Sequence, residues 1–119
     1  MTRVLGLDIG TKRTGVAVSD ELGLTARPLL TLPTDELAHS LPELLQANQA
    51  ETIVVGRPRR VDGELGKQAE VTERIVTGLR ETVNADWQYE DETATTISGD
   101  GSDESAACVM LQGYLHERA

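Results

Sequence analysis

Three acidic residues stand where an alternation of strands and helices could bring carboxylates together. Asp8 lies near the end of a short aliphatic run, Glu92 follows a strand-like segment, and Asp103 opens a helix-like segment. Carboxylate oxygens are preferred ligands of Mg²⁺ and Mn²⁺. Two such ions about 4 Å apart can activate a water and stabilise the leaving oxygen of a phosphodiester. The three acids therefore favour metal-dependent hydrolysis of a phosphodiester bond.

The same three acids also have structural interpretations, which the residues alone leave open. Asp8 could cap the turn that follows it, because aspartate readily accepts hydrogen bonds from nearby backbone amides. Glu92 could be surface charge within an acidic run, and Asp103 could be a first-turn acid behind an N-cap at Ser102. Burial of a carboxylate in an apolar strand is unfavourable unless it binds a cation or gains hydrogen bonds. A functional role is therefore best supported for Asp8.

The first acid lies in a predicted hairpin. Residues 3–9 form an aliphatic run typical of a buried strand, residues 10–15 form a glycine-containing turn, and residues 16–19 form a second strand. A third run, over residues 24–32, contains Pro28. Proline cannot donate a ladder hydrogen bond, so Pro28 favours an edge strand. These segments predict three strands in a meander.

Helices and strands alternate along the rest of the chain. Ser40-x-x-Glu43 has the form of a capping box and Pro42 is unfavourable inside a helix, so we expect a regular helix to begin near Ser40 after a looser turn. The continuous apolar run at residues 52–56 predicts a central parallel strand covered on both faces. The remaining predictions are a loop (57–66), a helix (71–83), a strand (87–90), a turn (99–101) and a final helix (106–115). The pattern predicts a single α/β domain over residues 1–119, with a mixed sheet and helical crossovers.

The formal net charge of −9 is unevenly distributed along the chain. Residues 1–60 carry seven basic and seven acidic residues, whereas residues 61–119 carry four basic and thirteen acidic residues. Nucleic-acid-binding proteins normally present a basic surface. The candidates for such a surface are Lys12 and Arg13, followed by the weaker group of Arg57, Arg59 and Arg60. The acidic half is expected to be a solvated surface that approaches phosphates only through metal ions.

Composition predicts a globular cytoplasmic protein. Hydrophobic residues make up 39% of the chain and charged residues 26%, which is typical of folded rather than disordered chains. The sequence shows neither a run of eighteen apolar residues nor the features of a signal peptide. The single cysteine, Cys108, cannot form an internal disulfide, and its helical neighbours predict a buried structural thiol.

Four blocks of the sequence resemble the YqgF family, also called RuvX, of ribonuclease-H-like proteins. The first block, GLDIGTKRTGVAVSD over residues 6–20, is similar to the opening motif of that family almost throughout. The other blocks span residues 54–70, 91–96 and 103–115, in the family's order. The resemblance covers nearly the whole chain and implies a ribonuclease-H-like mixed sheet. The roles described for the family are cleavage of pre-16S rRNA and resolution of Holliday junctions.

The resemblance also implies a site and a function. Asp8, Glu92 and Asp103 would be the catalytic, metal-binding acids, with Mg²⁺ or Mn²⁺ as cofactor. Lys12 and Arg13 would help to position the nucleic-acid backbone. The implied function is a two-metal-ion endonuclease that processes the 5′ end of pre-16S rRNA, and the alternative is a Holliday junction resolvase-like DNA nuclease. We expect nucleic acid rather than a membrane as the partner, and a monomer or weak homodimer.

Two departures from the family's pattern favour further hypotheses. Thr93 and Ala94 stand where the family has Arg and Leu, and only a few residues separate Thr96 from Asp103, where relatives carry a longer segment with a basic helix. A chain shortened before its last helix in this way could be a non-catalytic binding module of the same fold. The segment Asp8-Ile9-Gly10-Thr11 also resembles the first phosphate motif of the actin and sugar-kinase fold. Those enzymes, however, close two domains around ATP, and this chain provides one.

Overall fold

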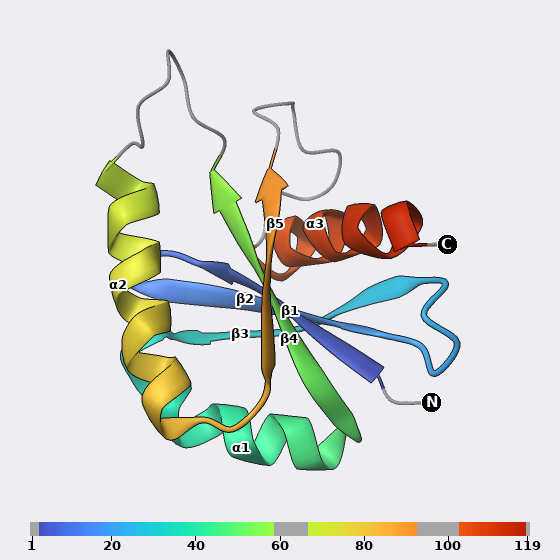
Figure 1. Cartoon of the computed structure of the whole chain (residues 1–119), viewed down its shortest axis with the longest axis horizontal. Coiled ribbons are helices and arrows are strands. Elements are labelled where there is room, and N and C mark those ends of the chain that lie inside the picture. Colours follow the sequence, from blue (N-terminus) through green and yellow to red (C-terminus); the bar gives the residue numbers. More distant parts are fainter. Residues whose placement is uncertain (1–2, 59–66, 93–102, 119) are drawn as a thin grey trace.

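The computed structural model of the chain describes residues 3–58, 67–92 and 103–118 (Figure 1). The strands are β1 (Arg3–Ile9), β2 (Arg13–Ser19), β3 (Ala26–Pro33), β4 (Ala50–Pro58) and β5 (Asp86–Glu92). The helices are α1 (Leu37–Ala47), α2 (Lys67–Thr82) and α3 (Asp103–Arg118), and a 3₁₀ turn, η1 (Thr34–Glu36), leads into α1. Three strands therefore come first, followed by helices that alternate with the last two strands.

The five strands form one mixed sheet in the order β3-β2-β1-β4-β5. β1, β2 and β3 pair antiparallel, whereas β4 pairs parallel with both β1 and β5. The predicted meander, followed by parallel strands with helical crossovers, is confirmed. Because β1, β4 and β5 run in the same direction, their carboxyl ends lie at the same edge of the sheet, where ligands bind in open α/β sheets.

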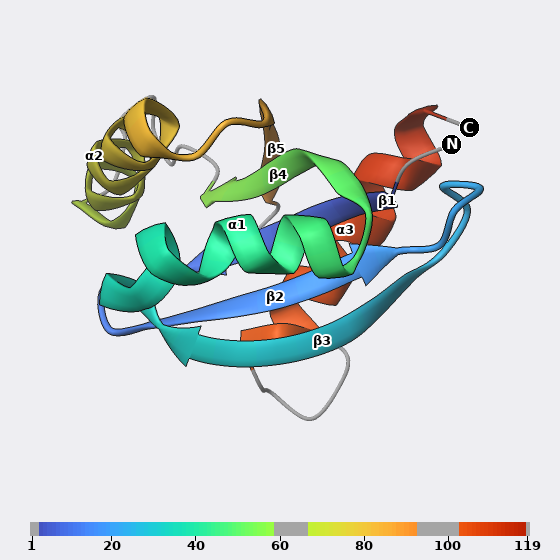
Figure 2. The ribbon, with the colours of Figure 1, turned by 90° about the horizontal axis from the view of Figure 1, so that it is seen from below.

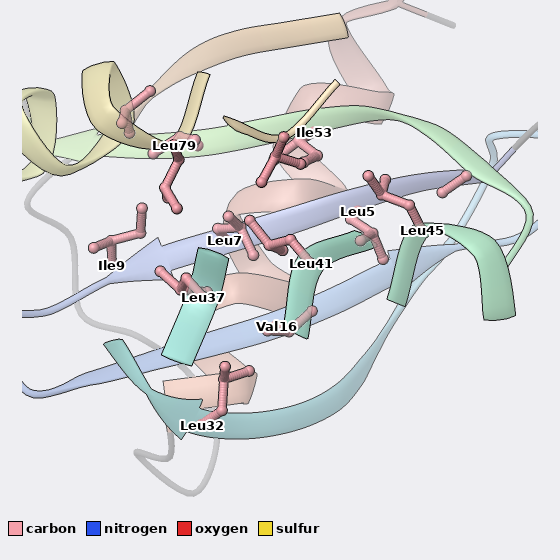
Figure 3. Close-up of a cluster of buried hydrophobic side chains, with 14 of the residues drawn as sticks. Leu5, Leu7, Ile9, Val16, Leu32, Leu37, Leu41, Leu45, Ile53 and Leu79 are labelled. Carbon is pink, nitrogen blue, oxygen red and sulfur yellow. The ribbon is translucent and has the colours of Figure 1, made fainter. Parts of the chain in front are cut away.

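Helices cover both faces of the sheet, with α1 on one face and α3 on the other (Figure 2). The larger core cluster joins β1, β2 and β4 to α1 and α2. Leu37, Leu41 and Leu45 of α1 recur every fourth residue and pack onto the sheet beside Leu5 and Leu7 (Figure 3). Full burial of one such side chain contributes about 1.5–3 kcal/mol. This face holds the helices against the sheet without using any of the predicted site residues.

The second core cluster lies between α3 and the other face of the sheet. Ala107, Leu111 and Tyr114 of α3 pack there with Ala17 and Val54 of the strands. Val54 is buried here while its neighbours in β4 are buried in the first cluster. The prediction of a central strand covered on both faces is therefore confirmed.

The start of α1 differs from the prediction. The helix begins at Leu37 rather than near Ser40 and contains Pro42, so the predicted capping box is wrong. Burial of Leu37 one turn before Leu41 extends the apolar stripe and stabilises the additional turn. Pro42 lies on the exposed side, as does Ala38, whose carbonyl loses its helical partner and can bond to water instead. The looser turn expected before the helix is confirmed by η1.

Two smaller predictions can be compared with the structure. Pro28 lies in β3, which forms an edge of the sheet as predicted, and the ladder shifts register between its partner Ala17 and Val16. Cys108 is half-buried rather than buried, with its Sγ 3.4 Å from the carbonyl oxygen of Ala26. Burial raises the pKa of the Cys108 thiol, so the uncharged form is favoured.

Several predictions fall on residues outside the described ranges. They are the loop after Pro58 with Arg59 and Arg60, the turn at 99–101, the N-cap at Ser102 and the shortened segment before Asp103. No helix in the described part of the chain is long and apolar enough to span a membrane.

Candidate active site

Asp8 lies on the α3 face of β1, next to the carboxyl end of the strand. Its neighbours Leu7 and Ile9 are buried in the cluster under α1 and α2. Because side chains alternate along a strand, Gly6 and Asp8 belong to the opposite face. Gly6 lies directly against α3, since a Cβ at this position would be 2.9 Å from the Cβ of Leu111. The face that carries Asp8 is therefore the face that α3 covers.

Gly15 of β2 makes the contact that brings Asp103 close to Asp8. It is the cross-strand partner of Asp8 in the β1–β2 hairpin. A Cβ at Gly15 would overlap the carbonyl oxygen of Asp103 and would lie 2.6 Å from the amide nitrogen of Glu104. The first turn of α3 therefore rests directly on the backbone of Gly15. Through this contact, Asp103 comes to lie beside Asp8 although the two are far apart in the sequence.

The two carboxylates influence each other electrostatically. Burial raises the pKa of Asp8 above its ordinary value of 3.8, and the negative charge of Asp103 raises it further. Both effects disfavour the ionised form of Asp8 unless a positive charge is near. The pair therefore forms a negatively charged site that favours a bound cation.

Arg13 supplies one positive charge to this site. Its Nε donates a hydrogen bond to Oδ2 of Asp103 at 3.0 Å. The next residue of α3 is also fixed, because Oε2 of Glu104 accepts a hydrogen bond from the Thr31 hydroxyl at 2.8 Å. Lys12, the other predicted contact for the nucleic-acid backbone, is exposed beside Arg13. The first turn of α3 is thus held by both β2 and β3.

A hydroxyl network holds the turn that carries these two basic residues. The Thr34 hydroxyl donates to the carbonyl of Gly10 at 2.7 Å and lies 2.9 Å from the Thr14 hydroxyl. The amide of Thr34 donates to the carbonyl of Lys12 at 2.9 Å, and the amide of Gly10 donates to the carbonyl of Arg13 at 2.9 Å. Thr14 and Thr34 are both buried. The backbone of the turn is therefore fixed, whereas the basic side chains extend from it.

The third predicted acid is placed only by its backbone. Glu92 is the last residue of β5 and pairs with Pro58 at the carboxyl end of β4. This is the same edge of the sheet to which β1 leads, but the side chain of Glu92 lies outside the described residues. Among the side chains that the structure describes, no three His, Cys, Asp or Glu residues gather as a metal-binding group. The structure thus brings together two of the three predicted acids, Asp8 and Asp103.

Arg57 has a different environment from Arg13. It forms an ion pair with Glu73 of α2 at 3.6 Å, and its guanidinium carbon lies 4.8 Å from the centre of the Tyr89 ring. Tyr89 packs against the cluster under α1 and α2, so these contacts lie on the face opposite Asp8. Arg57 therefore connects α2 to the sheet, and its contacts give no support to its weaker candidacy for nucleic-acid binding.

The donor atoms at the site fit a hard divalent cation. Asp8 and Asp103 offer only carboxylate oxygens, which Mg²⁺ and Mn²⁺ prefer over nitrogen or sulfur. Arg13 balances one of the two negative charges, and its contact with Asp103 is a single hydrogen bond to one oxygen. The remaining carboxylate oxygens of the pair are therefore suited to a cation that keeps several of its waters.

Comparison with known proteins identifies the family. The model of the RuvX family, described as Holliday junction resolvase, matches residues 2–117. The chain belongs to the RuvX family. RuvX relatives from Bacillus cytotoxicus and Geobacillus kaustophilus are 37% and 40% identical to it, over 98% of this chain and 99% of each relative. Both relatives carry the name "Putative pre-16S rRNA nuclease", and the family and these names support a nuclease role.

These RuvX relatives are longer than this chain. The alignments run over 136 residues, whereas the chain has 119, so at least 17 aligned positions have no counterpart here. A shortened chain is therefore confirmed. The location of the shortening, before the last helix, stays a prediction.

Solved structures confirm the fold of this RuvX chain. RuvC from Thermus thermophilus, in complex with a Holliday junction substrate, matches with a TM-score of 0.60 and 14% identity, over 99% of this chain and 96% of RuvC. The Holliday junction resolvase of fowlpox virus matches with a TM-score of 0.55 and 11% identity, over 98% of this chain and 99% of that protein. At these identities the likeness concerns the fold, and the predicted ribonuclease-H-like sheet is confirmed.

Two residues that position this RuvX site were missed by sequence reasoning. Gly15 was assigned only to a turn, although a glycine opposite Asp8 in a two-stranded hairpin is a signal for close approach of another backbone. Thr34 carried no recognisable signal, because its role depends on the end of β3 returning to the turn between β1 and β2.

Proposed function

We propose that this RuvX chain is a divalent-metal-dependent endonuclease that cleaves precursor 16S rRNA at its 5′ end. The observation that carries the proposal is the contact between the first turn of α3 and Gly15, which brings Asp103 beside Asp8 at the carboxyl end of β1. The names of the relatives, which align over nearly their whole length, support the choice of precursor rRNA as substrate.

In this proposal each residue of the site has a separate role. Asp8 and Asp103 hold the cation, and Glu92 contributes a third carboxylate from the end of β5. A divalent ion bound there would supply positive charge to the scissile phosphodiester and to its attacking water. Lys12 and Arg13 extend from a fixed turn and contact phosphates next to the scissile one. A role in processing precursor rRNA, supported by the names of the relatives, would have the protein act in the cytoplasm.

The distribution of charge limits how the substrate can approach. All of the net negative charge lies in residues 61–119, so a nucleic-acid backbone is repelled from that half. The exposed basic side chains next to the described site are those of Lys12 and Arg13, and Arg13 contacts α3. With so few phosphate contacts, binding is expected to be weak and to show a shallow dependence on salt. Selectivity would then come from the shape of the RNA rather than from its charge.

A cleavage assay distinguishes this function from its alternatives. The full chain is incubated with a 5′-extended 16S rRNA precursor or with a four-way DNA junction, in Mg²⁺, in Mn²⁺ or in a chelator. The proposal predicts cleavage of the RNA with either metal and none with the chelator. Cleavage of the junction alone would instead support the resolvase alternative. Binding of either nucleic acid without cleavage in any metal would support the non-catalytic binding module.

A further inference from the structure

The ion pair between Arg13 and Asp103 joins a predicted phosphate contact to a predicted metal ligand. Nε of Arg13 donates to Oδ2 of Asp103 at 3.0 Å, and the two side chains are 73% and 36% exposed. The same carboxylate would be needed by a divalent cation, and the same guanidinium would be needed by a phosphate. One contact therefore occupies two groups that the proposed function uses separately.

The geometry of the pair leaves part of the arginine open. Only Nε binds Asp103, and within the described residues the two terminal nitrogens of Arg13 have no hydrogen-bond partner. Those two nitrogens form the planar fork that binds phosphate oxygens in pairs. The backbone of Arg13 is fixed by the turn, since its carbonyl accepts the amide of Gly10. Arg13 can therefore exchange partners by rotating its exposed side chain while the turn stays in place.

Once a divalent cation is bound, the charges at the site favour release of Arg13 from Asp103. Two carboxylates, those of Asp8 and Asp103, lie side by side, and the single guanidinium bound to Asp103 offsets only one of their two negative charges. A divalent cation carries twice the charge of the guanidinium and repels it at short range. Binding of the cation therefore weakens the contact between Arg13 and Asp103.

We infer that Arg13 is a counter-ion for Asp103 in the metal-free protein, and that metal binding releases it to a phosphate of the substrate. The inference rests on the proposed function and adds to it a coupling between two binding events. Metal binding and substrate binding then favour each other through the side chain of Arg13. Lys12 has the same charge and belongs to the same turn, but among the described residues no hydrogen bond or ion pair joins it to Asp103, so we expect it to take no part in the exchange.

The test compares Arg13→Gln with Lys12→Gln in the full chain. Affinity for Mn²⁺ alone is measured by calorimetry, and affinity for the precursor RNA is measured separately by anisotropy. Both variants remove one positive charge near the site, so any long-range effect on Mn²⁺ binding is similar in the two. Exposed ion pairs contribute about 0.2–1 kcal/mol, so Arg13→Gln is expected to bind Mn²⁺ about 1.4- to fivefold more tightly than Lys12→Gln. Both variants are expected to bind the RNA more weakly than the wild-type protein.

Opposite changes in the two affinities are the decisive result. A purely structural loss at Arg13 would weaken both Mn²⁺ and RNA binding, and equal Mn²⁺ affinities in the two variants would overturn the inference. Failure of the proposed function gives a different pattern. If the wild-type protein binds no Mn²⁺, or if Asp8→Asn binds it as tightly as the wild type, the metal site itself is contradicted and the inference with it.

Discussion

The position of Asp103 depends on Gly15 having no side chain, and Gly15→Ala tests this dependence. The new methyl group would overlap the carbonyl of Asp103 and lie 2.6 Å from the amide of Glu104, where ordinary contact requires 3.4 Å or more. The obstacle is backbone rather than a flexible side chain. Relief of the contact with the Glu104 amide alone needs about 0.8 Å, and the closer Asp103 carbonyl requires the first turn of α3 to withdraw further than that. Overpacking of this kind costs about 1–3 kcal/mol. For a domain of this size, the upper half of that range lowers Tm by roughly 8–15 °C.

The same displacement separates the two acids. Loss of support around a metal ligand typically weakens metal binding by about 10- to 100-fold, and we expect a loss of that size for Mn²⁺ in Gly15→Ala. Calorimetry with Mn²⁺ and thermal unfolding without metal measure the two effects on one preparation.

Two other glycines provide matched controls. Gly6→Ala overpacks the same helix against Leu111, where the new Cβ would meet a side chain at 2.9 Å, so it is expected to lower Tm with a smaller effect on Mn²⁺ affinity. Gly78→Ala has no atom within 4 Å and lies inside α2, so it is expected to stabilise the protein by about 0.5–1 kcal/mol. If Gly15→Ala bound Mn²⁺ as tightly as the wild type, the contact with α3 would not be what positions Asp103.

Three further substitutions test other parts of the account. Because the folded pKa of Asp8 is raised above 3.8 by burial and by Asp103, ionisation of Asp8 lowers stability as pH rises through its folded pKa. Asp8→Asn should therefore have a higher Tm than the wild type at pH 7 without metal, and this difference should disappear towards pH 3.8. In Mg²⁺ the wild type should have the higher Tm. A lower Tm of the variant at pH 7 without metal would contradict this reasoning. Thr34→Val removes the buried hydrogen bond with Thr14 and the partly buried one to Gly10, and is expected to lower the free energy of unfolding in urea by about 1–2 kcal/mol. An unchanged free energy of unfolding would refute the role of the network. Arg57→Ala should lower the free energy of unfolding by up to about 1 kcal/mol and leave the affinity for Mn²⁺ unchanged. A weaker affinity for Mn²⁺ in this variant would instead place Arg57 in the site.

The local part of the site could be predicted from the sequence. The hairpin that carries Asp8 is encoded by short apolar runs around a glycine-containing turn, and the central strand by a continuous apolar run. These features depend only on neighbours in the chain, so reading the sequence was sufficient for them. The mixed sheet then followed from the order of strands and helices.

The remaining features depend on contacts between distant residues. Contact of the Asp103 backbone with Gly15 requires α3 to return across β2, and no spacing in the sequence specifies that approach. The early start of α1 at Leu37 shows the same effect, because burial against the sheet outweighed the local preference expressed by Pro42. The ion pair of Arg13 likewise joins residues that the sequence assigned to separate roles.

The central claim is that Asp8 and Asp103 act as a pair in metal-dependent cleavage. The most direct test is the single-turnover rate of precursor rRNA cleavage in Mn²⁺ by Asp8→Asn and Asp103→Asn, with Asp20→Asn as the control. Asp20 accepts the amide of Leu24 at 2.7 Å in the turn between β2 and β3, away from the paired acids. Loss of a group that only supports a metal ligand already lowers metal affinity or activity by about 10- to 100-fold. We therefore predict that the cleavage rate falls by about 100-fold or more in the variants of the paired acids and changes little in the control. Cleavage by Asp8→Asn at the wild-type rate would contradict the account.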